Sequence, residues 1–126
     1  MIMIKKFTFE NKALRKEAFA IRHKVFVIGQ NCPKDLEYEF EEESTHFLLF
    51  EDEVPLATAR HRKTEKGFKL ERFAVLEAAR GKGYGMQILQ AILHDLKDEK
   101  KLRIFYSHKF SIGYLFGFLV LARCML

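Results

Sequence analysis

Arg80-Gly81-Lys82-Gly83-Tyr84-Gly85 places three glycines and two cations directly before a long amphipathic segment. Apolar residues recur along that segment at helical spacing and predict a helix with one apolar face: Met86, Ile88, Leu89, Ile92, Leu93 and Leu96. The first turn of a helix has backbone N–H groups without intrahelical partners and carries the positive end of the helix dipole. Since glycine lets this backbone bend and approach a ligand closely, the stretch predicts a loop that binds an anion such as phosphate.

The segments on either side of this loop predict a β-α-β unit. Residues 68–76 alternate in character and predict a strand before the loop. Residues 102–107 form a short apolar segment with little alternation, as expected of a buried strand in a parallel pair. The loop is therefore expected at the end of one strand, where it opens the helix that leads to the next.

Glu71 is the candidate catalytic group on the strand before the loop. In a strictly alternating strand it shares a face with Phe73 and Val75. A carboxylate on a partly apolar face is expected to have a raised pKa, which suits a general base for an ammonium group. The alternative is an ion pair with Lys69 or with the neighbours of Arg72, and spacing alone favours the ion pair.

The upstream chain predicts antiparallel strands and one helix. The helix is expected to begin after a cap at Asn11 and to end near Gly29, because apolar residues step along one face between them. The acidic stretch Asp35–Glu43 predicts a loop or short helix. It is either a solvated face, which is slightly favoured, or a surface that attracts cationic acceptors and repels anionic ones. The expected strands are residues 4–9, 45–50 and 54–62, the last two joined as a hairpin.

Length and composition indicate a single domain, residues 1–126. The chain has 126 residues, 48% of them apolar, which suffices for one core but not for two ordinary domains. The net charge of +5 suits an anionic ligand, but the cations are not interleaved with exposed aromatic residues on one evident face, which argues against nucleic acid. No apolar segment reaches the ~20 residues of a membrane span, and Cys32 and Cys124 form no metal-binding motif. The expected location is the cytoplasm, with no bound metal and no membrane contact.

The glycine loop has neither the GxxxxGK[ST] spacing of a Walker loop nor the glycine spacing of a dinucleotide fingerprint. It resembles the [RQ]xxGx[GA] loop of the GCN5-related N-acetyltransferase (GNAT) family, and Leu70–Leu76 resembles the fourth strand of that family. The Arg-x-x-Val-Phe stretch from Arg22 to Phe26 is similar to the branch of small bacterial proteins of the ElaA or YjcF type. These segments occur in the family's order and run from the first strand to about Ser107, most of the chain.

The resemblance implies an α/β fold of the acyl-CoA N-acyltransferase type, with antiparallel N-terminal strands and a β-α-β crossover after the glycine-rich loop. It implies acetyl-CoA as cosubstrate and a primary amine of a small molecule or peptide as acceptor. Glu71 matches the position of the base in several members, and Arg22 and Phe26 lie where this branch borders the acceptor pocket. The implied cofactor-binding residues are Phe73, Ala74 and Val75 for the pantetheine arm, and Arg80, Gly81, Lys82, Gly83, Tyr84 and Gly85 for the pyrophosphate.

The C-terminal segment departs from the family pattern and is expected to be atypical or shortened. Family members usually carry a tyrosine there that protonates the leaving thiolate. The matching residue is Tyr114, but its spacing to the following glycine is one residue short. The alternative function is therefore a CoA-binding or interaction module with impaired catalysis. The apolar tail Phe118–Leu126 also favours a homodimer contact.

Overall fold

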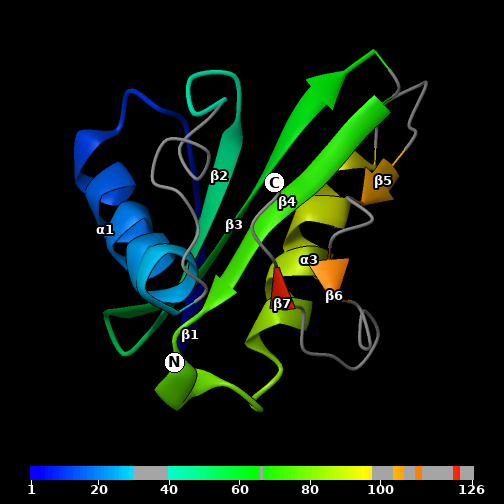
Figure 1. Ribbon diagram of the computed structural model, residues 1–126. Coiled ribbons are helices and arrows are strands. Elements are labelled where there is room, and N and C mark those ends of the chain that lie inside the picture. Colours follow the sequence, from blue (N-terminus) through cyan, green and yellow to red (C-terminus); the bar gives the residue numbers. More distant parts are fainter. Residues whose placement is uncertain (30–39, 66, 98–103, 107–109, 112–120, 123–126) are drawn as a thin grey trace.

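The computed structural model describes residues 1–29, 40–65, 67–97, 104–106, 110–111 and 121–122. Its centre is a five-stranded mixed sheet in the order β1-β2-β3-β4-β5 (Figure 1). Strands β1 to β4 pair antiparallel with one another, and β5 pairs parallel with β4. The strands are β1 (Ile2–Phe7), β2 (Thr45–Glu51), β3 (Val54–Thr64), β4 (Gly67–Val75) and β5 (Ile104–Tyr106).

The sheet confirms the antiparallel N-terminal strands and the β-α-β crossover expected from the sequence. The turn of the β2–β3 hairpin has Asp52 and Glu53 at φ values of 49° and 70°. Two consecutive positive φ values fit the right-handed twist of a tight hairpin. The first strand lies earlier in the chain than the predicted residues 4–9. It is Ile2–Phe7, with Phe7 opposite His46, and Phe9 lies beyond its end.

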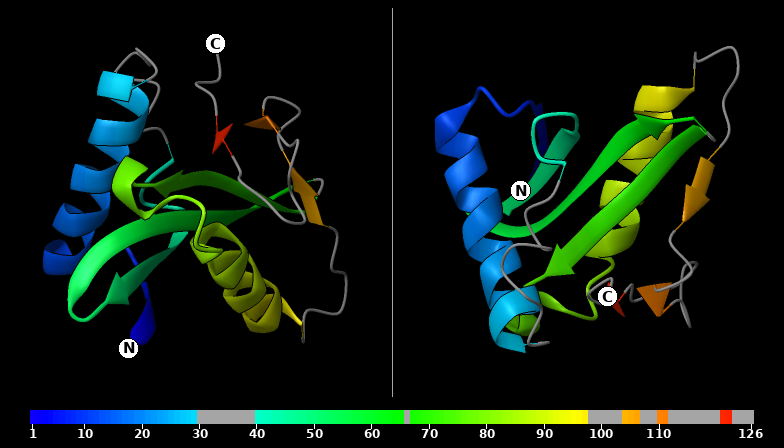
Figure 2. Two further views of the ribbon diagram at one scale, coloured as in Figure 1. Left: turned by 90° about the horizontal axis from the view of Figure 1, so that it is seen from below. Right: turned by 45° about the horizontal axis from the view of Figure 1, so that its top comes forward.

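Two helices lie on opposite faces of the sheet (Figure 2). Helix α1 (Lys12–Arg22) is capped by the Asn11 side chain, which accepts a 3.1 Å hydrogen bond from the backbone N–H of Leu14. It continues directly into η1 (His23–Ile28), a π-helical segment, so the single helix predicted here changes its winding after Arg22. Such π-helical turns occur often at functional sites. Helix α3 (Tyr84–Leu96) begins at the glycine loop and packs on the other face.

Successive side chains of β3 point to opposite faces of the sheet, as the alternation of its sequence predicts. Arg60 bonds to Glu41 on the α1 side, whereas His61 contacts Asp95 of α3. Apolar side chains form a core on both faces, because α1 and α3 each bury most of the face that their spacing predicts, although Leu93 of that α3 face is 36% exposed. The α1 face also buries charged side chains. The fully buried members of the core include Ala18, Phe26, Leu48, Leu49, Ala57, Ala59, Leu70, Ala74, Ile88 and Ile92.

A β-bulge interrupts β4. Thr58 of β3 lies opposite Ala74, but Arg60 lies opposite Glu71, so β4 contains one residue more than β3 over this interval. Arg72, within the bulge, has a φ of 57°. Because the extra residue reverses the alternation, Glu71 shares its face with Ala74. The expectation that Glu71 shares a face with Phe73 and Val75 was therefore wrong.

The described part of β5 pairs with β4 from Phe68 to Leu70, where Leu70 lies opposite Tyr106. The bulge begins directly after this last described pair. A second sheet consists of β6 (Phe110–Ser111) and β7 (Leu121–Ala122), which pair antiparallel. Among the residues described here, no helix combines the length and apolar character that a membrane crossing requires.

Candidate functional site

The glycine loop joins the end of β4 to α3. After β4 comes η2 (Glu77–Ala79), a short 3₁₀ turn, and α3 begins at Tyr84. Gly81 and Gly83 have φ values of 83° and 80°, a region that side chains with a Cβ rarely adopt. Gly83 is the N-cap residue, and no side chain caps this helix end. The first turn of α3 therefore starts from a backbone conformation that depends on glycine.

The backbone of the loop is open to approach. A Cβ added at Gly81, Gly83 or Gly85 would meet no atom within 4 Å. Internal crowding therefore does not explain the glycines. Gly85 lies in the first turn of α3 with no positive φ, where glycine costs about 1 kcal/mol of helix stability relative to alanine. A ligand that approaches this backbone closely is a physical reason to have glycine there.

The loop is fastened to the sheet at two points. The Tyr84 hydroxyl donates to the Glu51 carboxylate of β2, and this side chain is buried. The Arg80 guanidinium donates through Nε to the carbonyl oxygen of Val75, at 3.0 Å. Lys82 is exposed. Of the predicted phosphate-binding side chains, Arg80 and Lys82 thus lie at the surface, whereas the Tyr84 side chain points into the protein.

The predicted pantetheine segment lies at the other side of this loop. Phe73 and Ala74 are buried and Val75 is half-buried, at the end of β4 that follows the bulge. They lie past Leu70, the last residue of β4 with a described partner on β5. The structure therefore brings together the end of β4, the point where its described pairing with β5 stops, and the open N-terminus of α3.

Glu71 is the centre of a buried ion network on the α1 face of the sheet. Its Oε2 accepts hydrogen bonds from Nε and Nη2 of Arg60, at 2.8 and 2.5 Å, and from Nε of Arg62, at 3.0 Å. Lys69 Nζ lies 3.4 Å from Oε1. The ion pair with Lys69 that spacing favoured is present, and two arginines of β3 add to it.

The cations around Glu71 also determine its pKa. Burial is the largest single influence and raises the pKa, but Arg60, Arg62 and Lys69 together outweigh it and lower the value from 4.5 to about 2. The raised pKa expected from an apolar face was therefore wrong, because the pairing of β3 with β4 places Glu71 opposite Arg60, and the bulge turns Phe73 and Val75 to the other face. Glu71 is ionised at neutral pH and is a weak base. Its role as general base stays a prediction.

Glu41 extends the network to α1. Its Oε1 accepts from Nη1 of Arg60, at 2.7 Å, and from Nη2 of Arg22. The Glu41 side chain is 7% exposed, so the solvated face expected for the acidic stretch was wrong for this residue. The neighbouring Glu42 and Glu43 are exposed, as that interpretation expects.

The two residues predicted to border the acceptor pocket are buried. Arg22 and Phe26 are 1% and 0% exposed. The Arg22 guanidinium lies 5.3 Å from the ring centre of Phe19 and bonds to Glu41. Both contact residues line a pocket of about 520 Å³, whose described walls are Phe9, Phe19, Phe40, Glu41, Glu42 and Glu43. Arg22 therefore contacts residues of the pocket wall and is not itself one of its described lining residues. Direct contact of Arg22 or Phe26 with an acceptor stays a prediction.

The buried histidines His46 and His61 contact aromatic rings of the core, and His61 also contacts a carboxylate. His46 stacks on Phe7, with ring centres 5.3 Å apart, and burial lowers its pKa. His61 Nε2 lies 3.1 Å from an oxygen of Asp95 and its ring contacts Phe47 and Phe68. In the described ranges, no three His, Cys, Asp or Glu side chains group as metal ligands would.

The low pKa of Glu71 predicts that the protein loses stability in acid. A carboxylate with a pKa of 4.5 when unfolded and about 2 when folded stabilises the fold above pH 4.5, and this contribution is lost as the pH falls towards 2. The difference corresponds to roughly 3 kcal/mol of unfolding free energy. Urea unfolding between pH 7 and pH 2.5 measures it, and a smaller loss in a Glu71→Gln variant assigns it to this residue.

Sequence reasoning missed Arg60 and Glu41, which connect the predicted site residues. An inward-facing arginine in a central strand is a signal for Arg60, because such a buried cation needs a carboxylate partner. Glu41 had no signal that separates it from the other acids of its stretch. Tyr114, the predicted thiolate acid, and His108, a weaker candidate next to the fifth strand, lie outside the described residues.

Comparison with known proteins agrees with this fold. A profile of the "Acetyltransferase (GNAT) family" matches residues 13–118. The "Uncharacterized N-acetyltransferase YjcF" of Bacillus subtilis (strain 168) is 38% identical over 84 residues, which are 66% of this chain. The chain spans 60% of the length of that relative.

Two solved structures share the fold. Escherichia coli ElaA matches with a TM-score of 0.72 at 21% identity, over 82% of this chain and 76% of that one. A "predicted acetyltransferase with acetyl-CoA" from Clostridium acetobutylicum matches with a TM-score of 0.62 at 16% identity, over 84% of this chain and 80% of that one. The resemblance noted in the sequence is confirmed, and the chain belongs to the Acetyltransferase (GNAT) family.

Proposed function

We propose that this protein transfers an acetyl group from acetyl-CoA to a primary amine. The observation that carries the proposal is the open backbone at Gly81, Gly83 and Gly85, at the N-terminus of α3 and beside the end of β4. The family match supports the reaction class. The acceptor is a small molecule or a peptide.

The residues of the loop fit the phosphates of CoA. Their backbone offers the unpaired N–H groups of a helix start, with the positive end of the helix dipole behind them. Arg80 and Lys82 are exposed beside it and add two positive charges. We assign the pantetheine arm to the backbone of Phe73, Ala74 and Val75, at the end of β4, where a further strand-like partner has hydrogen-bonding groups to meet.

When bound, acetyl-CoA supplies a thioester carbonyl carbon that a neutral amine can attack. The acceptor must first lose a proton from its ammonium form, and the thiolate of CoA must gain one as it leaves. We assign the first proton to Glu71, directly or through water. As the C–N bond forms and the C–S bond breaks, Tyr114 gives its proton to the thiolate, and the nitrogen loses its second proton through water to the tyrosinate or to solvent. Because Glu71 has a pKa of about 2, it accepts a proton only transiently.

Isothermal titration calorimetry of the purified protein with acetyl-CoA tests the proposal, together with release of free thiol in the presence of amines. The expected result is binding at micromolar to millimolar ligand, with thiol release that requires an amine. No binding at millimolar acetyl-CoA contradicts the proposal. Binding without thiol release across a broad amine panel favours the alternative, a CoA-binding module. The single domain, the cytoplasmic location and the homodimer stay predictions.

A further inference from the structure

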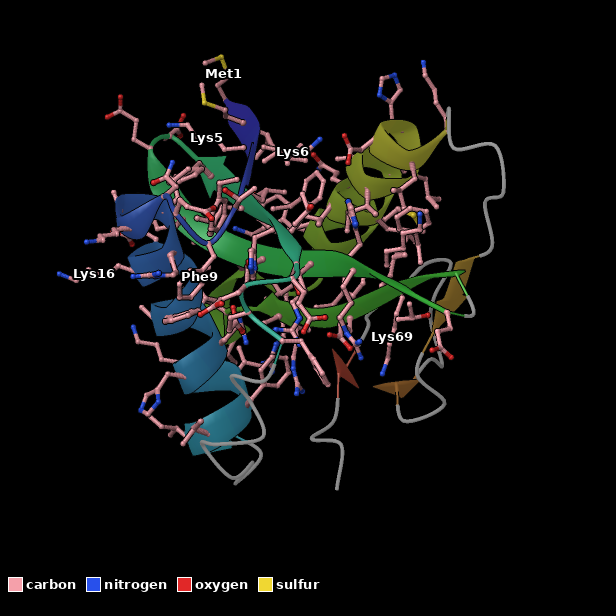
Figure 3. All side chains as sticks on the ribbon, turned by 90° about the horizontal axis from the view of Figure 1, so that it is seen from above. Met1, Lys5, Lys6, Phe9, Lys16 and Lys69 are labelled. Carbon is pink, nitrogen blue, oxygen red and sulfur yellow. The ribbon has the colours of Figure 1, made fainter. Side chains whose placement is uncertain are left out.

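Four charged side chains form a compact group on the α1 face of the sheet, at the start of β4. Arg60 lies opposite Glu71 and Arg62 lies opposite Lys69 in the antiparallel register of β3 and β4. We call these four residues the β3–β4 charge group. Figure 3 shows Lys69 extending from β4 on the side of the sheet away from α3. Three of the members are cations and one is a carboxylate, so the group has an excess of positive charge.

Arg62 and Lys69 carry the excess positive charge. As direct cross-strand neighbours of like charge they destabilise the sheet unless an anion lies between or beside them. Their side chains are only 13% and 11% exposed, so water screens them little. Both are directed at Glu71, but this carboxylate already accepts two hydrogen bonds from Arg60. Of the three cations around Glu71, Arg60 has a second carboxylate partner, Glu41, whereas Arg62 and Lys69 have only Glu71 in the part of the chain that the structure describes.

Some hydrogen-bond donors of Arg62 and Lys69 have no partner among the described residues. Arg62 reaches Glu71 only through Nε, and its terminal nitrogens Nη1 and Nη2 have no hydrogen-bond partner in the part of the chain that the structure describes. Lys69 has a single ionic contact there, at 3.4 Å, which is too long for a good hydrogen bond. Two terminal guanidinium nitrogens and an adjacent ammonium match the two oxygens of a carboxylate.

Phe40 connects this group to the pocket. The Arg62 guanidinium lies 4.0 Å from the ring centre of Phe40, a stacking that fixes the plane of its donors. Phe40 itself has a φ of 61°, unusual for a bulky residue, and is 43% exposed. The same ring lines the pocket of about 520 Å³. A molecule in that pocket is thus separated from Arg62 by one aromatic side chain.

We propose that the acceptor amine also bears a carboxylate, as a free amino acid does, and that Arg62 and Lys69 bind this carboxylate. This inference rests on the proposed acetyl transfer. The added carboxylate reduces the excess positive charge of the β3–β4 charge group, and Glu71 on the same face is then placed to interact with the ammonium end of the same molecule. A bare amine leaves the excess positive charge uncompensated and is also repelled by it.

The test compares each amino acid with its amide as acceptor, for example phenylalanine with phenylalaninamide and lysine with lysinamide. The amide keeps the side chain but has a less basic amine, so a larger fraction of it is neutral near pH 7 and able to attack the thioester. The amide is therefore expected to be the better acceptor unless the protein recognises the carboxylate. The expected result is a kcat/KM about tenfold or more higher for the amino acid than for its amide. Arg62→Gln and Lys69→Gln are each expected to reduce this ratio, mainly through KM.

Lys63→Gln is the matched control, because Lys63 is exposed next to Arg62 on the same strand and lies opposite Phe68. It removes the same charge and is expected to keep the ratio. Thiol release with amino acids and amides at equal kcat/KM overturns this inference and leaves the acetyl transfer standing. Without thiol release, calorimetry of phenylalanine and its amide on the CoA-bound protein decides: equal or absent binding overturns it. Weaker acetyl-CoA binding by Arg62→Gln with an unchanged ratio assigns the anion to the cofactor and also overturns it.

Discussion

Glu71→Gln is expected to lower the unfolding free energy by about 3–5 kcal/mol at neutral pH, because it leaves buried cations without their shared carboxylate. Arg60 and Arg62 donate to the same oxygen of Glu71, and Lys69 lies beside the other one. Glutamine keeps the shape but not the charge. A loss of this size is a large part of the ~5–15 kcal/mol by which a typical domain is stable. Urea unfolding at pH 7, followed by circular dichroism, measures it.

Glu65→Gln is the control for the loss of a negative charge, since Glu65 is exposed in the turn between β3 and β4. Its effect is expected to stay within about 0.5 kcal/mol. Equal stability of Glu71→Gln and the unsubstituted protein contradicts the network. The same variant tests the base: its rate should fall mainly below the pH at which the acceptor amine is already neutral, and an unchanged pH–rate profile removes Glu71 from that role.

Gly83→Val is expected to weaken acetyl-CoA binding at least about tenfold, which is roughly 1.4 kcal/mol. Gly83 has a φ of 80° at the N-cap of α3, where a β-branched side chain is strained. A Cβ there meets no atom of the protein within 4 Å. The side chain therefore occupies the space through which the phosphates reach the backbone, and it also shifts the first N–H groups of the helix. Isothermal titration calorimetry with acetyl-CoA measures the change.

Gly67→Val separates backbone strain from loss of binding. Gly67 has a φ of 132° and is the first residue of β4, at the opposite end of that strand from the glycine loop. It is expected to reduce stability without reducing the affinity for acetyl-CoA. Binding by Gly83→Val as tight as that of the unsubstituted protein argues that the phosphates lie elsewhere.

Local sequence patterns predicted most of the fold. The apolar spacing of α3 and the alternation of β3 were confirmed, because these patterns follow directly from helix and strand geometry. The positive φ values at Gly81 and Gly83 agree with the reason for expecting glycine in the loop. The order of these elements and their motifs also sufficed to indicate the family. The predictions that failed locally were the end of the first strand and the uniform winding of the helix that continues into η1.

Only the tertiary structure decided the electrostatics of the site. The pairing of β4 with β3 places Glu71 opposite Arg60 and within reach of Arg62, and the bulge at Arg72 turns Phe73 and Val75 to the other face of the sheet. Glu41 meets Arg22 and Arg60 across 19 residues of sequence in each direction. The sequence by itself determined where the helices, strands and glycine loop lie, since short-range periodicity and backbone freedom control them. The pKa of a carboxylate depends instead on which distant charges the folded chain brings beside it.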